Sequence, residues 1–151
     1  MDPRRLHPLS WLIAGPLAAL VLGSRLPRPP FGPLRGLGVP LMFAGLGARL
    51  WCEQVLTHAG TSTDPEERPR ALVQEGPYGF SRNPMMVGAL LILGGATLAS
   101  GSPTLAFYTL GWLSAVDRYL REVEEPELQE RFGSEYEAYS AQVSRWLPGL
   151  P

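Results

Sequence analysis

The sequence predicts an all-α integral membrane protein with about four transmembrane helices, a helical hairpin at 84–120 and a C-terminal cytoplasmic amphipathic helical tail. The first observation is that no charged side chain occurs from residue 83 to residue 116. An apolar span of that length exceeds what one membrane crossing needs and does not suit the surface of a small soluble domain. Second, two further stretches, 6–24 and 36–48, also lack charge. Third, most acidic residues gather in 64–75 and 117–137.

The four helices follow from these stretches in order. The chain has 151 residues, which suits a single domain, 1–151. A transmembrane helix needs about 20 mostly apolar residues, and the predicted spans are roughly 6–24, 36–57, 84–100 and 103–120. The second requires Arg49 and Glu53 to lie near a membrane face. The sequence SGSP at 100–103 divides the longest stretch into two helices. The first helix imitates a signal peptide but lacks a cleavage site, so we expect it to be retained.

The remaining segments are connectors and a tail. Residues 25–35 are rich in proline and predict an extended connector, and 59–71 predict a polar loop. In the tail, apolar and aromatic residues recur at intervals of three and four, which indicates one face of a helix. These residues are Leu128, Phe132, Tyr136, Tyr139, Val143 and Trp146. Gly133 is expected to end one helix, and Ser134 with Glu137 predicts a capping box for the next.

Composition limits the function. The net charge is −1, which does not favour nucleic-acid binding. The single cysteine, Cys52, cannot form an internal disulfide, and no metal site or obligate protein partner is indicated. Arginines predominate on the side shared by the N-terminus, 59–83 and the tail. The positive-inside rule therefore places both termini and the 59–83 loop on the cytoplasmic side. We expect a bacterial inner membrane, with the active site facing the cytoplasm.

Two segments carry polar signatures at the mouths of the hairpin. In 76–84 (GPYGFSRNP), Pro84 suits the first turn of a helix and Asn83 falls at its N-cap. This is either a capped helix start or a set of free N–H groups that bind an anion. Glu124 and Glu125 are either a solvated face or acceptors for a ribose or amine. A helical hairpin in lipid brings both segments to the same side.

Together these segments resemble the isoprenylcysteine carboxyl methyltransferase and phospholipid N-methyltransferase superfamily, over residues 72–148. The first half of its pattern is matched by Leu72, Val73, Gly76, Pro77, Tyr78, Arg82, Asn83, Pro84, Met85 and Gly88. The second half is matched by Glu124, Glu125, Leu128, Phe132, Gly133, Tyr136, Tyr139, Val143, Arg145 and Pro148. Asn83 stands where the better-known members have His, and Met86 where they have Tyr.

The resemblance implies an S-adenosylmethionine-dependent methyltransferase. The implied cofactor-binding residues are Leu72, Val73, Gly76, Pro77, Tyr78, Arg82, Asn83, Pro84, Met85, Glu124 and Glu125. No catalytic residue is assigned, with Arg82 and Arg121 as candidates, and Asn83 cannot carry a proton at neutral pH. The acceptor is expected to be lipophilic: an isoprenylcysteine carboxylate, a lipid amine or a small hydrophobic molecule. It would reach the site from the membrane lipid past Met86 and Leu90, unless these side chains simply pack against neighbouring helices.

Two alternative functions remain open. One is an NADPH-dependent membrane reductase of the steroid-reductase type, whose C-terminal part looks similar. The other is a small membrane scaffold or transport protein. The second is favoured by Arg49 and Glu53, four residues apart within a hydrophobic segment, since charges inside a membrane often mark a pathway. Both side chains could instead extend to the nearby interface.

Overall fold

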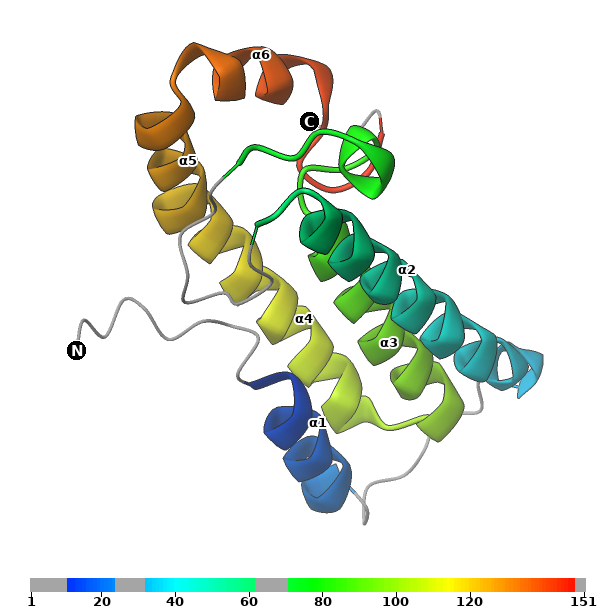
Figure 1. Ribbon diagram of the computed structural model, residues 1–151. Coiled ribbons are helices and arrows are strands. Elements are labelled where there is room, and N and C mark those ends of the chain that lie inside the picture. The colour runs from blue at the N-terminus through cyan, green and yellow to red at the C-terminus, as the bar shows by residue number, and fades with distance from the viewer. Residues whose placement is uncertain (1–10, 24–31, 62–70, 149–151) are drawn as a thin grey trace.

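The computed structural model describes residues 11–23, 32–61 and 71–148, and within these ranges it is all-helical. Three helices lie side by side: α2 (Gly38–His58), α3 (Pro84–Ser100) and α4 (Pro103–Tyr119) (Figure 1). The shorter α1 (Trp11–Leu22) packs against α4. At the opposite end of the bundle, α5 (Glu125–Phe132) and α6 (Ser134–Gln142) arch over the segment that precedes α3.

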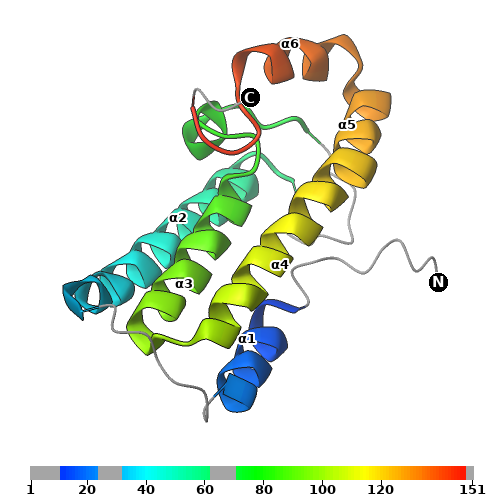
Figure 2. The same cartoon turned by 180° about the vertical axis from the view of Figure 1, so that it is seen from behind.

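The predicted hairpin at 84–120 is confirmed. Gly101 ends α3 in the left-handed conformation at φ 62°, and the Ser102 side chain accepts a hydrogen bond from the Leu105 N–H at the start of α4. The helix does not stop near residue 120, however. It continues through the π-helical turn η6 (Leu120–Glu124), closed by a hydrogen bond from the Glu125 N–H to the Leu120 carbonyl, into α5. One rod therefore leads from the hairpin turn to the tail (Figure 2).

Small residues let α2 and α3 approach closely. A Cβ atom on Gly88 would lie 2.9 Å from the carbonyl oxygen of Gly45, and one on Gly38 would lie 2.6 Å from the carbonyl oxygen of Gly95. Because glycine has no Cβ atom, the backbones of the two helices can approach closely at these two crossing points. On its other side, α3 forms an apolar core with α4 and η6. Its buried members are Met86, Ala89, Leu93, Trp112, Val116 and Leu120.

The four predicted membrane crossings are not reproduced. Among the described residues, no helix is both long and apolar enough to cross a membrane. Helices α3 and α4 have 17 residues each, about 26 Å of rise against a hydrocarbon core of about 30 Å. Helix α2 has 21 residues but carries Arg49 and Glu53. Part of the predicted first span, residues 6–10, lies outside the described ranges.

Smaller differences concern the connectors and the tail. Of the predicted connector 25–35, residues 32–35 belong to a short 3₁₀ helix, η4 (Gly32–Leu37), because a proline near the start is compatible with a helical turn. The rest, and residues 62–70 of the polar loop, lie outside the described ranges. In the tail, Gly133 separates α5 from α6 as predicted, at φ 53°. The capping box is wrong: Gly133 itself is the N-cap of α6, and Ser134 is already in the helix.

Candidate functional site

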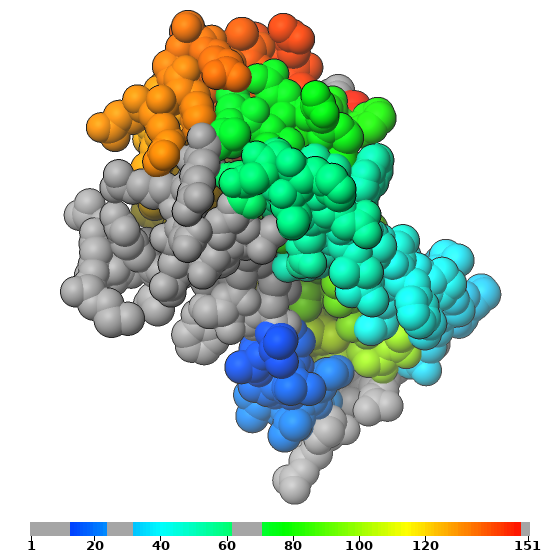
Figure 3. Space-filling view, in the orientation of Figure 1, coloured from blue at the N-terminus to red at the C-terminus, as the bar shows by residue number. Residues whose placement is uncertain are grey.

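The two signature segments meet at one end of the bundle. The first runs from residue 71 to residue 83 and contains the 3₁₀ turn η5 (Gly76–Gly79). The second comprises η6, α5, α6 and the residues that follow them. In the space-filling view α5 and α6 lie directly against the first segment (Figure 3). The return of the hairpin thus brings together motifs that are far apart in sequence.

A single carboxylate links these segments. Both oxygens of Glu125 accept hydrogen bonds from Arg145, at 2.7 Å from Nε and 2.8 Å from Nη2. Nη1 of Arg82 lies 3.0 Å from the same carboxylate and also donates to the Tyr136 hydroxyl at 2.9 Å. The three charged side chains are between 12 and 19 % exposed. The hydrogen bonds from Arg145 to Glu125 raise the pKa of the Arg145 guanidinium, so this group stays charged.

Main-chain contacts fasten the chain after α6 to the same loop. The Arg82 N–H donates to the Ser144 carbonyl at 2.9 Å. The Arg145 carbonyl accepts from the Ser81 hydroxyl at 3.1 Å and from Asn83 Nδ2 at 3.2 Å. Asn83 holds the N-cap position of α3, but its side chain makes no cap hydrogen bond. The buried amide of Asn83 therefore joins the two segments through Arg145.

Tyr78 stands at the centre of the loop. Its carbonyl accepts a 2.7 Å hydrogen bond from the buried Tyr139 hydroxyl. Burial raises the pKa of the Tyr78 phenol, the charge of Glu124 adds to this rise, and the charge of Arg49 opposes it. Burial likewise raises the pKa of Tyr139 to about 12. Both phenols stay protonated at neutral pH, and Tyr78 lies within electrostatic range of one acidic and one basic side chain.

Glu124 differs from its neighbour. Its side chain is partly buried and makes no hydrogen bond or ion pair with any other described residue. Burial raises the pKa of this carboxyl to about 7, and the charges of Glu125 and Glu127 contribute to the rise. The carboxylate of Glu124 is therefore available to a cationic ligand, whereas that of Glu125 is occupied by two arginines.

Arg49 reaches the site from α2. Its Nη1 donates to the Met85 carbonyl in the first turn of α3, at 3.3 Å. Arg49 forms no ion pair with Glu53, which is also described and lies four residues further along α2. Sequence reasoning missed Arg49 as a site residue. Its spacing from Gly45 and Cys52, four and three residues along α2, was a signal that it shares their inward face.

The other predicted cofactor-binding residues lie along the same loop. Leu72 and Val73 are half-buried, Pro77 is buried, and Gly76 has φ 58°. Pro84 occupies the first turn of α3, followed by Met85. Arg121, a candidate for catalysis, lies apart from this loop. It pairs with Asp117 at 2.7 Å on an exposed face of α4 and η6.

The two residues predicted to contact the acceptor have different surroundings. Met86 belongs to the buried core between α3 and α4, as the packing alternative expects. Leu90, one turn further along α3, lines an open apolar cavity of about 370 Å³. The cavity lies between α2, α3 and α4 and includes Leu41, Leu98, Thr109 and Leu110 among its walls.

Comparison with known proteins identifies a family. A family model described as phospholipid methyltransferase matches residues 34–135, which include α2, the loop, the hairpin, α5 and both glutamates. No curated protein matches the chain.

Proposed function

Because the chain belongs to the phospholipid methyltransferase family, we propose that it transfers the methyl group of S-adenosylmethionine to a lipophilic acceptor. The observation that carries this proposal is the contrast between Glu125 and Glu124. Glu125 fixes Arg82 and Arg145, which holds the loop and the tail together. Glu124 is left partly buried, with no described partner, within electrostatic range of Tyr78.

The donor set of the described residues fits this cofactor. S-adenosylmethionine carries a sulfonium and an ammonium, which a carboxylate such as Glu124 attracts, and a carboxylate, which guanidinium groups bind. Nε of Arg82 is buried and has no hydrogen-bond partner among the described residues. A buried donor without a partner is costly, so a ligand oxygen at this position would satisfy it. Leu72, Val73, Tyr78 and Met85 would border the rest of the cofactor.

When bound, the sulfonium supplies an activated methyl group, so the protein needs only to align the reactants and exclude water. The Arg82–Glu125–Arg145 network fixes the loop that carries Tyr78 relative to the helix that carries Glu124. Asn83 contributes through its hydrogen bond to Arg145 and transfers no proton, since an amide does not titrate. No general base is required of Arg82 or Arg121.

A membrane setting is supported by the outer faces of the helices. Large apolar side chains are exposed on α1, α2 and α4; they include Ile13, Val21, Leu22, Phe43, Phe107 and Leu110. Such a surface suits lipid better than water. Helix α3, with 17 residues, falls a few Å short of the hydrocarbon thickness, a mismatch that local thinning of the bilayer can accommodate. We therefore propose that the protein is embedded in a membrane and that its site lies at the cytoplasmic face.

The acceptor is proposed to place its apolar part in the cavity beside Leu90. This cavity opens to the surface between α2, α3 and α4 and has apolar walls. Along α3 the cavity begins at Leu90 and continues toward the hairpin turn, away from Met85. An acceptor with its apolar part in the cavity would extend its polar end past Met85 toward the loop. A lipid amine agrees with the family description, while an isoprenylcysteine carboxylate and a small hydrophobic molecule also fit.

Calorimetric titration of the purified protein with S-adenosylhomocysteine and, separately, with NADPH tests the proposal. We expect binding of the first and none of the second. NADPH binding alone would favour the reductase alternative, and binding of neither would favour a non-enzymatic role. Incubation of lipid extracts with a radiolabelled methyl donor would then identify the acceptor.

A further inference from the structure

The position of Arg49 on α2 leads to a further inference, which rests on the proposed function. Gly45, Arg49 and Cys52 follow one another at helical spacing on the face of α2 that meets α3. Gly45 approaches the α3 backbone at Gly88, and Cys52 is completely buried. Arg49 therefore projects from the most closely packed face of α2, an expensive place for a charge unless it has a partner.

The glycine at position 88 provides room for the Arg49 side chain. A Cβ atom there would lie 2.8 Å from Cγ of Arg49, so the stem of the arginine crosses α3 at this glycine. The guanidinium then lies at the first turn of α3, where it donates to the Met85 carbonyl. This end of α3 is the end at which the loop, Tyr78 and Glu124 come together.

The hydrogen bond to Met85 uses only one of the N–H donors of the Arg49 guanidinium. Arg49 has five N–H donors, and its single hydrogen bond within the described residues is to a neutral carbonyl at 3.3 Å. It forms no ion pair with another described residue. Planar guanidinium groups bind carboxylate and phosphate oxygens through two parallel hydrogen bonds.

The loop before α3 also lies against this part of α2. A Cβ atom on Gly76 would be 3.3 Å from Val55 and 3.7 Å from the Trp51 ring, so η5 rests on the next turn of the helix that carries Arg49. Tyr78 in η5 is within electrostatic range of both Arg49 and Glu124. The site thus has a basic group on α2 and an acidic group on η6.

We propose that Arg49 is a second anion-binding residue of this site, beside Arg82, and that it holds the oxyanion of a ligand whose cationic group lies beside Glu124. Two ligands have this chemistry. In S-adenosylmethionine the oxyanion is the carboxylate of the amino-acid part, next to the ammonium and sulfonium. In an amine-bearing phospholipid it is the phosphate.

The test measures binding to Arg49→Gln and Arg49→Lys in one detergent, with Arg118→Gln as the matched control. Arg118 forms an exposed pair with Glu122. The first pair of probes is S-adenosylhomocysteine and 5′-methylthioadenosine, which lacks the amino-acid part. The second pair is dihexanoyl phosphatidylethanolamine and dihexanoylglycerol, which lacks the phosphate and the amine.

We expect Arg49→Gln to weaken the binding of one oxyanion-bearing probe by about tenfold or more, or about 1.4 kcal/mol, and to leave the binding of its counterpart without an oxyanion unchanged. Arg49→Lys should fall in between, because it keeps the charge but loses the paired N–H groups. If only the affinity for S-adenosylhomocysteine falls, the oxyanion that Arg49 binds is the cofactor carboxylate. If only the affinity for the phospholipid falls, that oxyanion is the phosphate.

Unchanged affinities, or equal losses for the probes with and without an oxyanion, would overturn the proposal, since Arg49 would then act only on the packing of α2 and α3. A wild-type protein that bound neither oxyanion-bearing probe would instead overturn the proposed function itself.

Discussion

Replacement of Glu125 by alanine tests whether one carboxylate holds the two signature segments together. The variant removes the acceptor of two charged hydrogen bonds from Arg145, at 2.7 and 2.8 Å, and the partner of Arg82 in an ion pair at 3.0 Å. It leaves two guanidinium groups that are only 12 and 13 % exposed. If each of the three charged contacts contributed about 1.5–3 kcal/mol, they would sum to more than about 4 kcal/mol, but they share one desolvated carboxylate and are not additive.

Removal of one partner from a buried ion pair costs about 3–5 kcal/mol. Glu125 retains 19 % exposure, so we expect the free energy of unfolding to fall by about 3 kcal/mol, at the lower end of that range. The measurement is guanidinium unfolding followed by circular dichroism in one detergent. A shift of the midpoint at constant slope would report the change in stability.

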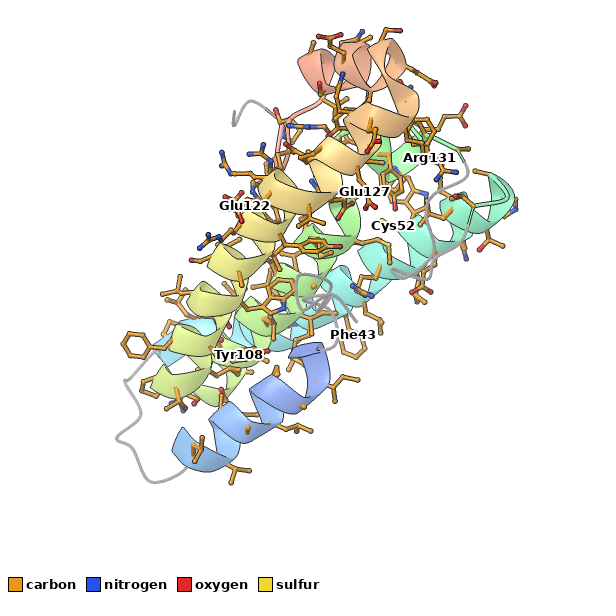
Figure 4. All side chains as sticks on the ribbon, turned by 90° about the vertical axis from the view of Figure 1, so that its left-hand side faces the viewer. Phe43, Cys52, Tyr108, Glu122, Glu127 and Arg131 are labelled. Carbon is orange, nitrogen blue, oxygen red and sulfur yellow. The ribbon has the colours of Figure 1, made fainter. Side chains whose placement is uncertain are left out.

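Glu122→Ala is the matched control for this variant. Glu122 pairs with Arg118 at the same 3.0 Å distance, but the two side chains are 59 and 76 % exposed. Glu122 projects from the outer face of the helix (Figure 4). An exposed pair of this kind contributes at most about 0.5 kcal/mol. Equal losses in the two variants would refute the structural role given to Glu125.

The same variant should bind S-adenosylhomocysteine about tenfold more weakly, or about 1.4 kcal/mol, because Arg82 and the loop lose their fixed position. If Glu125→Ala does not fold, Glu125→Gln keeps the shape of the side chain and one acceptor oxygen while removing the charge. Unchanged affinity in a folded Glu125 variant would show that this carboxylate has no part in binding.

Three further predictions follow from other contacts. Because burial raises the pKa of Glu124 to about 7, above its usual value of 4.5, the folded state holds an extra proton between these values. The free energy of unfolding should therefore fall as pH rises from about 4.5 to about 7 and be level above that, and Glu124→Gln should remove this dependence in a series of denaturation curves. Gly45→Ala should destabilise the protein by about 2 kcal/mol or more, since its Cβ would meet the α3 backbone, whereas Gly47→Ala, with open space around it, should raise the melting temperature. Tyr139→Phe removes the hydrogen bond to the Tyr78 carbonyl and should cost about 1 kcal/mol of stability; an unchanged midpoint would mean that this contact does not hold the loop.

Local chemistry made the hairpin and the meeting of its ends predictable. A 34-residue uncharged stretch is easily recognised, and the sequence SGSP marked the turn at which the structure places Gly101 and Ser102. Once two antiparallel helices are joined by a short turn, their far ends must lie close together. The contact between Glu125 and Arg82 follows from that geometry, and the predicted proximity of the two segments is confirmed for this pair.

Long-range partners could not be predicted in the same way. The sequence assigned Asn83 to the N-cap of α3, yet the nearest acceptor for its amide is the Arg145 carbonyl, 62 residues away. Arg49 had a nearby carboxylate in Glu53, but the close approach at Gly88 brings the Met85 carbonyl within reach of its guanidinium instead. The predicted bounds of the third and fourth helices agree with α3 (Pro84–Ser100) and α4 (Pro103–Tyr119), but no helix of the described residues is both long and apolar enough to cross a membrane.

The paired glutamates now have separate explanations. Successive side chains on a helix point about 100° apart, so two adjacent carboxylates cannot both face the same arginines. Glu125 pairs with Arg82 and Arg145, whereas Glu124 forms no ion pair with either, on a π-helical turn that closes from Glu125 to Leu120. Such turns alter the direction of the side chains that follow and are frequent at functional sites. A single position could not both neutralise two buried arginines and offer a free carboxylate to a ligand, because the first role uses both oxygens. The Glu124-Glu125 pair therefore divides one sequence motif into a residue that holds the two arginines and a residue that we propose binds the ligand.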